Sequence, residues 1–339
     1  MIKSTTNILI PASQMKSEFV RILKKSGFTE AKAEKCAEIF TTNSLEGVLS
    51  HGVNRFSRFV RNVLDGFINP SAEPSLIKNI GALEQWDGNL GAGPLNALFA
   101  TDRAISLSDE NGIGLVALSN TNHWMRGGKY GWHAAERGYV FVGWTNTIAN
   151  MPAWGAKDVR LGNNPFVIAV PDPKGAIVLD FAMSQFSYGK MEAYESEGKQ
   201  LPYPGGYNVK GEITTNPGEI LETWRTLPVG YWKGAGLSNL LDILAAILSG
   251  GRATYEITKS KTEFGVSQVF IAINLNQLSN LPSIGETIKN IKNDIHESIP
   301  ENEEIKIRYP GENVRSIREE SLKNGIPVNK NIWDEILIL

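Results

Sequence analysis

The first part of the chain, residues 12–50, carries apolar side chains at helical spacing. Gly27 can end a first helix in this segment, and Thr29 can cap a second one. Apolar residues that recur every three or four positions share one face of a helix. These residues are Met15, Phe19, Ile22 and Leu23 in the first helix, and Ala33, Cys36, Ala37 and Phe40 in the second. We therefore expect two amphipathic helices here.

The middle of the chain alternates between helical and strand-like patterns. Residues 95–107 predict a helix that stops near Asn111 and Gly112. Four apolar runs that predict strands are residues 114–118, 139–144, 166–170 and 176–179. The last two flank a Pro-Asp-Pro-Lys-Gly sequence at 171–175, which predicts a turn and therefore a β-hairpin. Because hairpin strands pair antiparallel, we expect a mixed, largely antiparallel sheet.

The last third of the chain begins with an unpatterned segment. Residues 189–230 are rich in Gly, Pro, Tyr and Thr and predict an irregular excursion with turns. A strongly apolar helix is expected over 237–248, ended at Gly250. Residues 269–273 predict a late strand, and the chain from Gly285 on is charged and mostly helical.

These patterns predict an α/β protein with two domains. The chain has 339 residues, and single domains usually run to about 100–200 residues. The Pro-containing stretch 69–74 is the first candidate boundary. We expect a mainly helical domain from residues 1–75 plus 235–339, and an α/β domain from residues 76–234.

Composition narrows the function classes. The formal net charge is -2, and nucleic-acid binders usually carry a basic excess, so no nucleic-acid partner is expected. The single Cys36 excludes an intrachain disulfide, fits a reducing compartment, and is expected to be a small buried residue. The apolar stretch at 8–10 is too short for a signal peptide, and the 237–248 run is too short to span a bilayer. We expect a soluble, cytoplasmic protein with no membrane partner.

Common cofactor and metal motifs are absent from the sequence. The glycines at 88–93 and 234–236 do not have the G-x-G-x-x-G spacing of a Rossmann site, and no P-loop occurs. The histidines are His51, His123, His133 and His296; none is paired as H-x-x-x-H, and no C-x-x-C occurs, so no metal site is expected. We assign His133 and His296 to surface or packing roles.

One candidate site is the segment from Ser50 to Phe59. Arg55 lies four residues after His51 and three before Arg58, so on a helix these residues share a face. Arg can grip a substrate carboxylate with two hydrogen bonds, and His can supply a proton near neutral pH. The alternative interpretation is a surface helix with solvated charges.

A second candidate is residues 120–128, which contain His123 and Arg126. They follow the strand expected at 114–118, and polar residues just after a strand often line ligand sites in α/β proteins. An ordinary loop with a hydrogen-bonded histidine is the alternative.

At these two segments the sequence resembles the type-2 malate/L-lactate dehydrogenases, NAD(P)-dependent oxidoreductases distinct from the Rossmann malate and lactate dehydrogenases. The resemblance covers nearly the whole chain. Its marks are Ser50-His51-Gly52 with Arg55, Asn122-His123, Gly162-Asn163-Asn164-Pro165, Asp180, Lys233-Gly234-Ala235-Gly236-Leu237 and Pro310-Gly311-Glu312. The resemblance implies a family-specific, non-Rossmann NAD-binding fold, which explains the missing glycine motif. It also implies a homodimer with the active site near the subunit interface.

The resemblance further implies roles for single residues. His51 matches the family's proton donor, His123 a second active-site histidine, and Arg55 a contact to the substrate carboxylate. We expect Arg58 and Arg126 to help Arg55 hold that carboxylate. The cofactor-contacting positions are Ala176, Ile177, Val178, Leu179, Asp180, Phe181, Ala182, Trp232, Lys233, Gly311, Glu312 and Asn313. The expected cofactor is NAD, with NADH preferred and NADPH not excluded. These segments place cofactor and substrate mainly on the α/β domain.

The expected reaction is the reduction of the 2-keto group of a small, hydroxylated sugar-type acid. Relatives commonly have Gly-Thr-Asn-Pro where this chain has Gly162-Asn163-Asn164-Pro165. This difference leaves the identity of the substrate open, but it does not change the expected type of reaction. The same framework could act on malate, ureidoglycolate or a cyclic imino acid. A sugar-acid binding protein without catalysis is the second alternative, and it needs no nicotinamide.

Overall fold

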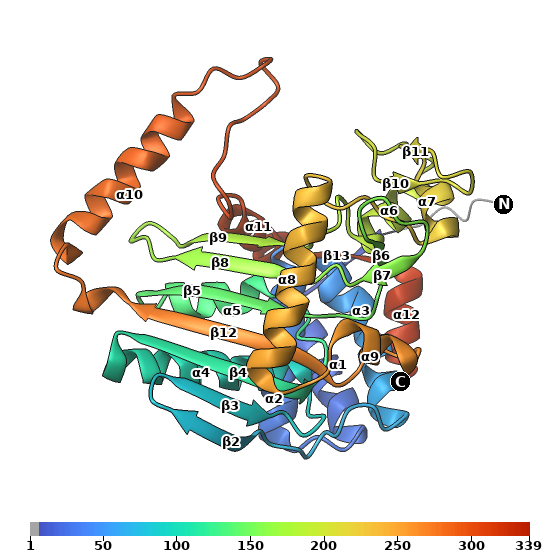
Figure 1. Cartoon of the computed structure of the whole chain (residues 1–339). Coiled ribbons are helices and arrows are strands. Elements are labelled where there is room, and N and C mark those ends of the chain that lie inside the picture. Colours follow the sequence, from blue (N-terminus) through green and yellow to red (C-terminus); the bar gives the residue numbers. More distant parts are fainter. Residues whose placement is uncertain (1–6) are drawn as a thin grey trace.

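A seven-stranded mixed sheet carries the middle of the chain in the computed structural model, which describes residues 7–339 (Figure 1). Its strands, in spatial order, are β2 (Ser75–Ile80), β3 (Leu83–Asp87), β4 (Ile113–Thr121), β12 (Val266–Asn274), β5 (Tyr139–Thr145), β8 (Phe166–Val170) and β9 (Ile177–Phe181). Only β3 and β4 pair parallel, and the other neighbours in this sheet pair antiparallel. The expected mixed, largely antiparallel sheet is confirmed, as is the β8–β9 hairpin.

The two faces of this sheet bury different helices. Successive side chains of a strand point to opposite faces. On β12, Phe270 packs with α4 (Gly93–Asn111) and α5 (Gly128–Ala135), whereas its neighbour Val269 packs with α8 (Trp232–Ser249). The helices expected at 95–107 and 237–248 are therefore confirmed as the two layers that cover the sheet.

A separate core joins the N-terminal helices to the C-terminal end of the chain. It contains α1 (Ala12–Lys25), α2 (Glu30–Leu45), α3 (Val53–Leu64) and α12 (Lys330–Leu337), together with β1 (Asn7–Ile10) paired antiparallel to β13 (Ile326–Asn329). Helix α11 (Val314–Asn324) packs against α2 and β13 at the edge of this core. Phe19 of α1 stacks on Phe56 of α3 with ring centroids 3.9 Å apart. Thr29 caps α2 by accepting a hydrogen bond from the Lys32 backbone, as expected.

The C-terminal third of the chain contributes to both parts of the molecule. β12 lies between β4 and β5 in the sheet, although its residues fall in the segment expected to be mainly helical. α12 packs in the helical core, and α11 packs at its edge. The division into 1–75 plus 235–339 and 76–234 stays a prediction.

Residues 189–230, expected to be irregular, contain regular elements, so that prediction is wrong in part. They hold most of α6 (Tyr188–Ser196), then β10 (Gly206–Tyr207), β11 (Ile213–Thr214) and α7 (Pro217–Thr223). Phe186, Met191, Leu201 and Ile220 form a small core among them. The helices are short and capped by Ser187 and Asn216, so too few turns exist for an apolar period to show in the sequence.

The remaining elements are short, apart from one long helix. They are η1 (Leu49–His51), β6 (Met151–Pro152), β7 (Val159–Leu161), α9 (Thr254–Lys259) and η2 (Leu275–Gln277). The long helix, α10 (Leu281–His296), projects from the sheet, and the chain returns from its end in a long loop (Figure 1). Within residues 7–339, no helix combines the length and the apolar character needed to cross a membrane.

Candidate active site

Helix α3 presents two arginines because its apolar face is anchored in the helical core. Phe56, Phe59 and Val60 are buried there. Arg55 and Arg58 lie three positions apart and line a common pocket. The expected shared face is confirmed for these two arginines. His51 is not on this helix but on η1 just before it.

The position of His51 is fixed by helix α2. The Asn43 side-chain amide donates a hydrogen bond to the His51 carbonyl oxygen at 3.0 Å. Gly52, the next residue, lies so close to α2 that an added Cβ would sit 2.2 Å from the Ser44 hydroxyl oxygen. That hydroxyl in turn accepts from the Val53 backbone N–H at 2.9 Å. The Ser-His-Gly sequence is thus the tight connection that turns the chain from α2 into α3. It leaves the His51 imidazole half-buried and facing the ring of His123.

His123 lies in the loop that follows β4, as the sequence predicted. The side-chain amide of Asn122 donates to the backbone carbonyls of Leu90 and Gly91, each at 3.0 Å. The next two residues, Trp124 and Met125, are buried in different cores: Trp124 in the core between the sheet and α4–α5, Met125 in the helical core. The loop therefore lies at the boundary between the two cores, which holds His123 facing α3.

The two histidines lie side by side. Their ring centroids are 5.6 Å apart and the ring planes differ by 23°. Burial and the nearby Arg55 and Arg126 lower the pKa of His51 to about 4. Burial, Arg55, His51 and Arg58 lower the pKa of His123 well below its usual value. Both rings are therefore neutral near pH 7 in the free site.

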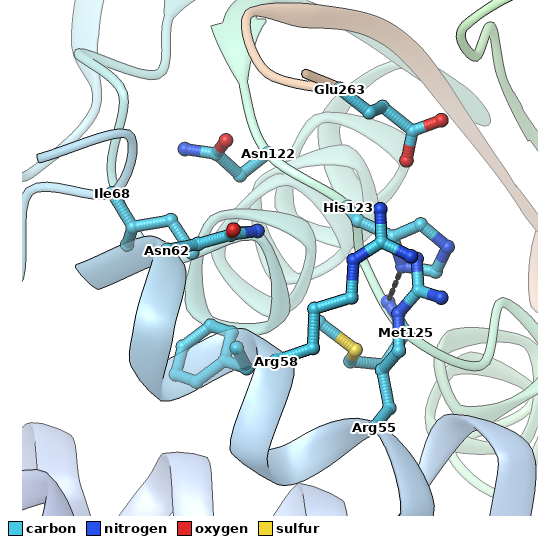
Figure 2. A pocket seen from close by; sticks show the side chains of 9 residues that line it. Arg55, Arg58, Asn62, Ile68, Asn122, His123, Met125 and Glu263 are labelled. Carbon is cyan, nitrogen blue, oxygen red and sulfur yellow. Dashed lines mark hydrogen bonds between the residues drawn. The ribbon is translucent and has the colours of Figure 1, made fainter. Parts of the chain in front are cut away.

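The pocket beside these rings combines positive charge with polar and apolar groups. Figure 2 shows the guanidinium groups of Arg55 and Arg58 close to the His123 ring. The lining residues are Arg55, Arg58, Phe59, Asn62, Ile68, Asn122, His123, Met125 and Glu263. Such a site can bind a carboxylate through the arginines and hold an adjacent carbonyl against the imidazoles.

Glu263 and Asn62 are pocket residues that sequence reasoning missed. Asn62 lies one helical turn beyond Arg58 on α3 and could have been found from that spacing. Glu263 follows α9, far away in the sequence, and its Oε2 accepts a hydrogen bond from the Ile148 backbone at 3.1 Å. No local pattern marks such an isolated acidic residue.

Arg126 is placed differently from the other two arginines. It is buried, and its guanidinium forms an ion pair with Glu46 of the α2–η1 connection. Arg318 of α11 approaches the other oxygen of the same carboxylate at 3.5 Å. Arg126 is not among the residues that line the pocket, and its proposed contact with substrate stays a prediction.

Two of the segments expected to contact a cofactor adjoin the third, β9, which is the edge strand of the sheet. The Val178 backbone N–H donates to the Pro310 carbonyl at 3.2 Å, which places Gly311 against the start of β9. Beyond the end of β9, the Val229 backbone donates to the Met183 carbonyl at 2.8 Å. This brings Trp232, at the start of α8, close to the same edge. Gly311 and Trp232 thus lie toward opposite ends of β9, and the contacts of these segments with a cofactor stay a prediction.

The segment that contains Gly311 packs closely against β9. Gly311 has φ +84°, and an added Cβ would lie 3.1 Å from the Val178 nitrogen and 3.3 Å from Cζ2 of Trp132. The Trp132 indole nitrogen is buried and has no hydrogen-bond partner among residues 7–339. A glycine at 311 therefore lets this segment pack tightly on β9 and Trp132. Asp180 accepts a hydrogen bond from the Gly128 backbone at 2.7 Å.

The two remaining histidines each form an ion pair outside this pocket. His133 binds Asp102 through Nε2 at 2.7 Å, and His296 binds Glu312 at 3.0 Å. Cys36 is buried, as expected. No cluster of three potential metal ligands occurs within residues 7–339.

Sequence comparisons match nearly the whole chain to known dehydrogenases and reductases. A family model described as malate/L-lactate dehydrogenase matches residues 10–337. The chain is 44% identical over 327 residues to 2,3-diketo-L-gulonate reductase from Escherichia coli O127:H6, covering 96% of this chain and 98% of that protein. The Citrobacter koseri protein of the same name matches at the same identity and coverage.

Solved structures give the same fold. Malate dehydrogenase from Pyrococcus horikoshii OT3 superposes with a TM-score of 0.88 at 30% identity, covering 97% of this chain and 93% of that one. Malate dehydrogenase from Entamoeba histolytica gives 0.92 at 25% identity, covering 98% and 96%.

Proposed function

Because the chain belongs to the malate/L-lactate dehydrogenase family, we propose that it is an NADH-dependent reductase that converts 2,3-diketo-L-gulonate to 3-dehydro-L-gulonate. The observation that carries this proposal is the stacked pair of neutral histidines, of which His123 lines one pocket with Arg55 and Arg58 and His51 lies against His123. The arginines suit the carboxylate of a 2-keto acid, and the imidazoles suit its carbonyl oxygen. The names of the reductases from Escherichia coli and Citrobacter koseri support the choice of substrate.

A hydroxylated substrate also suits the far side of the pocket. Asn62 and Glu263 add polar side chains to its lining. A carboxylate accepts hydrogen bonds from hydroxyl groups and repels a second carboxylate. The sugar-acid tail of 2,3-diketo-L-gulonate therefore fits better beside Glu263 than the second carboxylate of a malate-type substrate does.

A bound nicotinamide cofactor supplies the hydride for this reduction. Ala176–Ala182, Trp232, Lys233, Gly311, Glu312 and Asn313 would hold it along the β9 edge. The preference for NADH over NADPH is part of the proposal.

The protein's own residues bind the substrate and control the proton. Arg55 and Arg58 hold the carboxylate so that C2 is presented at the histidines. Burial is the main cause of the low pKa of His51, about 4, and the guanidinium charge of Arg55 lowers it further. A bound carboxylate would offset the part that is due to the guanidinium charge and so favour protonation. His51 can then carry a proton and give it to the oxygen at C2. General acid catalysis of this kind contributes about 10²–10⁴-fold to the rate.

A homodimer is part of the proposal. The outer face of α8 exposes Leu237, Leu240, Ile243, Leu244 and Ile247. A contiguous apolar surface of this kind is typical of a subunit interface. Light scattering on the purified protein tests it, with a mass of about twice the 37.2 kDa chain expected. A cytoplasmic location stays a prediction.

The reaction is tested by following NADH consumption with 2,3-diketo-L-gulonate, oxaloacetate and a cyclic imino acid in parallel. The proposal expects the diketo acid to have the highest kcat/KM. A higher value for another acid moves the protein to a different substrate in the same family.

A further inference from the structure

The hydrogen bonds at Nδ1 distinguish the two pocket histidines. Nδ1 of His123 accepts a hydrogen bond from the Met125 backbone N–H at 2.9 Å, drawn as the dashed line in Figure 2. A backbone amide nitrogen donates and never accepts. Nδ1 of His123 must therefore be unprotonated, and the neutral ring carries its proton on Nε2.

His51 has a different partner at the same atom. Its Nδ1 lies 3.0 Å from the Ser50 hydroxyl oxygen. A hydroxyl can donate or accept by rotating its hydrogen. The Ser50 contact therefore persists whether His51 is neutral or doubly protonated. By contrast, a second proton on His123 would set two N–H groups against each other at the Met125 contact.

The Met125 amide is held rigidly in its donating position. Met125 has φ +68°, a left-handed conformation that is costly for a residue with a side chain. Its side chain is 4% exposed, and that of Trp124 is 1% exposed. The Trp124 carbonyl also accepts a hydrogen bond from the Tyr130 hydroxyl at 2.6 Å. Packing in two cores thus maintains the strained backbone, and the amide cannot easily turn away from the imidazole.

The charges around His123 oppose a second proton as well. Arg55 and Arg58 face it from α3, His51 faces it from η1, and Glu263 lines the same pocket. The two positive charges of Arg55 and Arg58 outnumber the one negative charge of Glu263. These surroundings therefore favour the neutral form of the His123 ring.

We propose that His123 is a permanently neutral Nε2–H hydrogen-bond donor to the substrate carbonyl, and that His51 alone transfers the proton. The inference rests on the proposed function and assigns how the two histidines divide the work. C2 gains a hydride from the reduced nicotinamide, and the electron pair of the C2–oxygen π bond moves to the oxygen. The N–H bond of protonated His51 breaks, its proton goes to this oxygen, and His51 becomes neutral. His123 keeps its proton and stabilises the developing negative charge.

The tautomer is tested without substrate by NMR of the full-length protein labelled with ¹⁵N-histidine. The chain has only four histidines, and the His123→Gln variant identifies the His123 signals by their loss. We expect one neutral ring with a proton on Nε2 and none on Nδ1, unchanged between pH 8 and pH 6. A His123 ring protonated on Nδ1, or on both nitrogens within this range, overturns the inference.

The division of work is tested by paired substitutions. The glutamine amide can place an N–H near the position of Nε2 but cannot act as an acid. We expect His123→Gln to keep turnover within about tenfold of the parent, whereas His123→Ala loses about 10²–10³-fold, as for one lost donor to an oxyanion. Both His51→Gln and His51→Ala should lose about 10²–10⁴-fold.

Equal losses in the two His123 variants, or rescue of His51 by glutamine, contradict the assignment. Thermal unfolding of each variant identifies losses caused by misfolding. If the parent protein does not reduce 2,3-diketo-L-gulonate, the proposed substrate fails; the NMR spectrum still decides the tautomer, and the variants are compared on whichever 2-keto acid is reduced.

Discussion

The imidazole rings of His51 and His123 lie nearly parallel, with their centroids 5.6 Å apart. One ring is fixed by the connection between two helices of the helical core, and the other by a loop at the end of a sheet strand. The active site therefore exists only when both cores are assembled against each other. This explains why the loop residues after His123 bury their side chains in both.

Arg55 is expected to bind the substrate carboxylate. Arg55→Ala should lower kcat/KM for the keto acid by about 10–100-fold, mainly through KM, because hydrogen bonds to charged groups contribute about 1.5–3 kcal/mol. Steady-state kinetics at saturating NADH measures the change. Arg61→Ala is the matched control, since Arg61 lies on the same helix but binds Glu335 at the surface. An equal effect of both substitutions would remove Arg55 from this role.

Glu263 is expected to select against dicarboxylates. In Glu263→Gln the negative charge is lost while the size of the side chain is kept. The kcat/KM for oxaloacetate relative to that for 2,3-diketo-L-gulonate should rise about tenfold, which corresponds to about 1.4 kcal/mol of lost repulsion and hydrogen bonding. The ratio of the two substrates on one enzyme is measured, so differences in protein quality cancel. An unchanged ratio contradicts a role for Glu263 in specificity.

Gly311 is expected to hold residues 311–313 against β9, where they would contact the cofactor. Gly311→Ala should weaken NADH binding about tenfold or more, because the new methyl group would lie against β9 and Trp132. Gly155→Ala is the matched control: Gly155 has the same φ of +84° but no atom within 4 Å of an added Cβ. Both variants should lose stability through backbone strain, by about 1 kcal/mol.

Fluorescence titration with NADH and thermal unfolding separate these two effects. If the two glycine variants bind NADH equally well, Gly311 is not part of the cofactor site.

The low pKa of His51 predicts how stability depends on pH. The unfolded chain takes up a proton on this residue as the pH falls through about 6.5, whereas the folded protein does so only near pH 4. The unfolded state therefore binds more protons between these values, and the folded state loses stability as the pH falls. At pH 5 this loss is about 2 kcal/mol.

The effect of His51 on stability must be separated from that of carboxylates, which titrate in the same pH range. A substitution at His51 makes this separation. His51→Gln removes the titrating group, so the variant should lose about 2 kcal/mol less than the parent between pH 7.5 and pH 5. Urea unfolding at both pH values, at one protein concentration, measures the difference. Parallel pH dependences in the two proteins would show that His51 is not held neutral by the fold.

Much of the fold could be predicted because its signals are local. The Pro171–Gly175 turn joins two adjacent apolar runs, and the β8–β9 hairpin follows from that pattern alone. The helix at 237–248 is strongly apolar and ends at Gly250, whose φ is +68°. By contrast, β1 pairs with β13 at the opposite end of the chain, and short-range periodicity carries no information on such a pairing.

The candidate site was predictable only in part for the same reason. His51, Arg55 and His123 stand in recognisable motifs, but the contact between the two histidine rings depends on how the two cores pack. Glu263 reaches the pocket from yet another segment. Arg126 stands in a motif as well, and only the structure shows its ion pair with Glu46.

The most direct test of the account is the loss of NADH absorbance when the purified protein meets 2,3-diketo-L-gulonate. NADPH and pyruvate are run in parallel under the same conditions. The account predicts fast oxidation of NADH with the diketo acid, slower oxidation of NADPH, and little reaction with pyruvate. A folded, dimeric protein that oxidises no NADH with this acid would contradict the proposed substrate, while oxidation with another keto or imino acid would reassign it within the family.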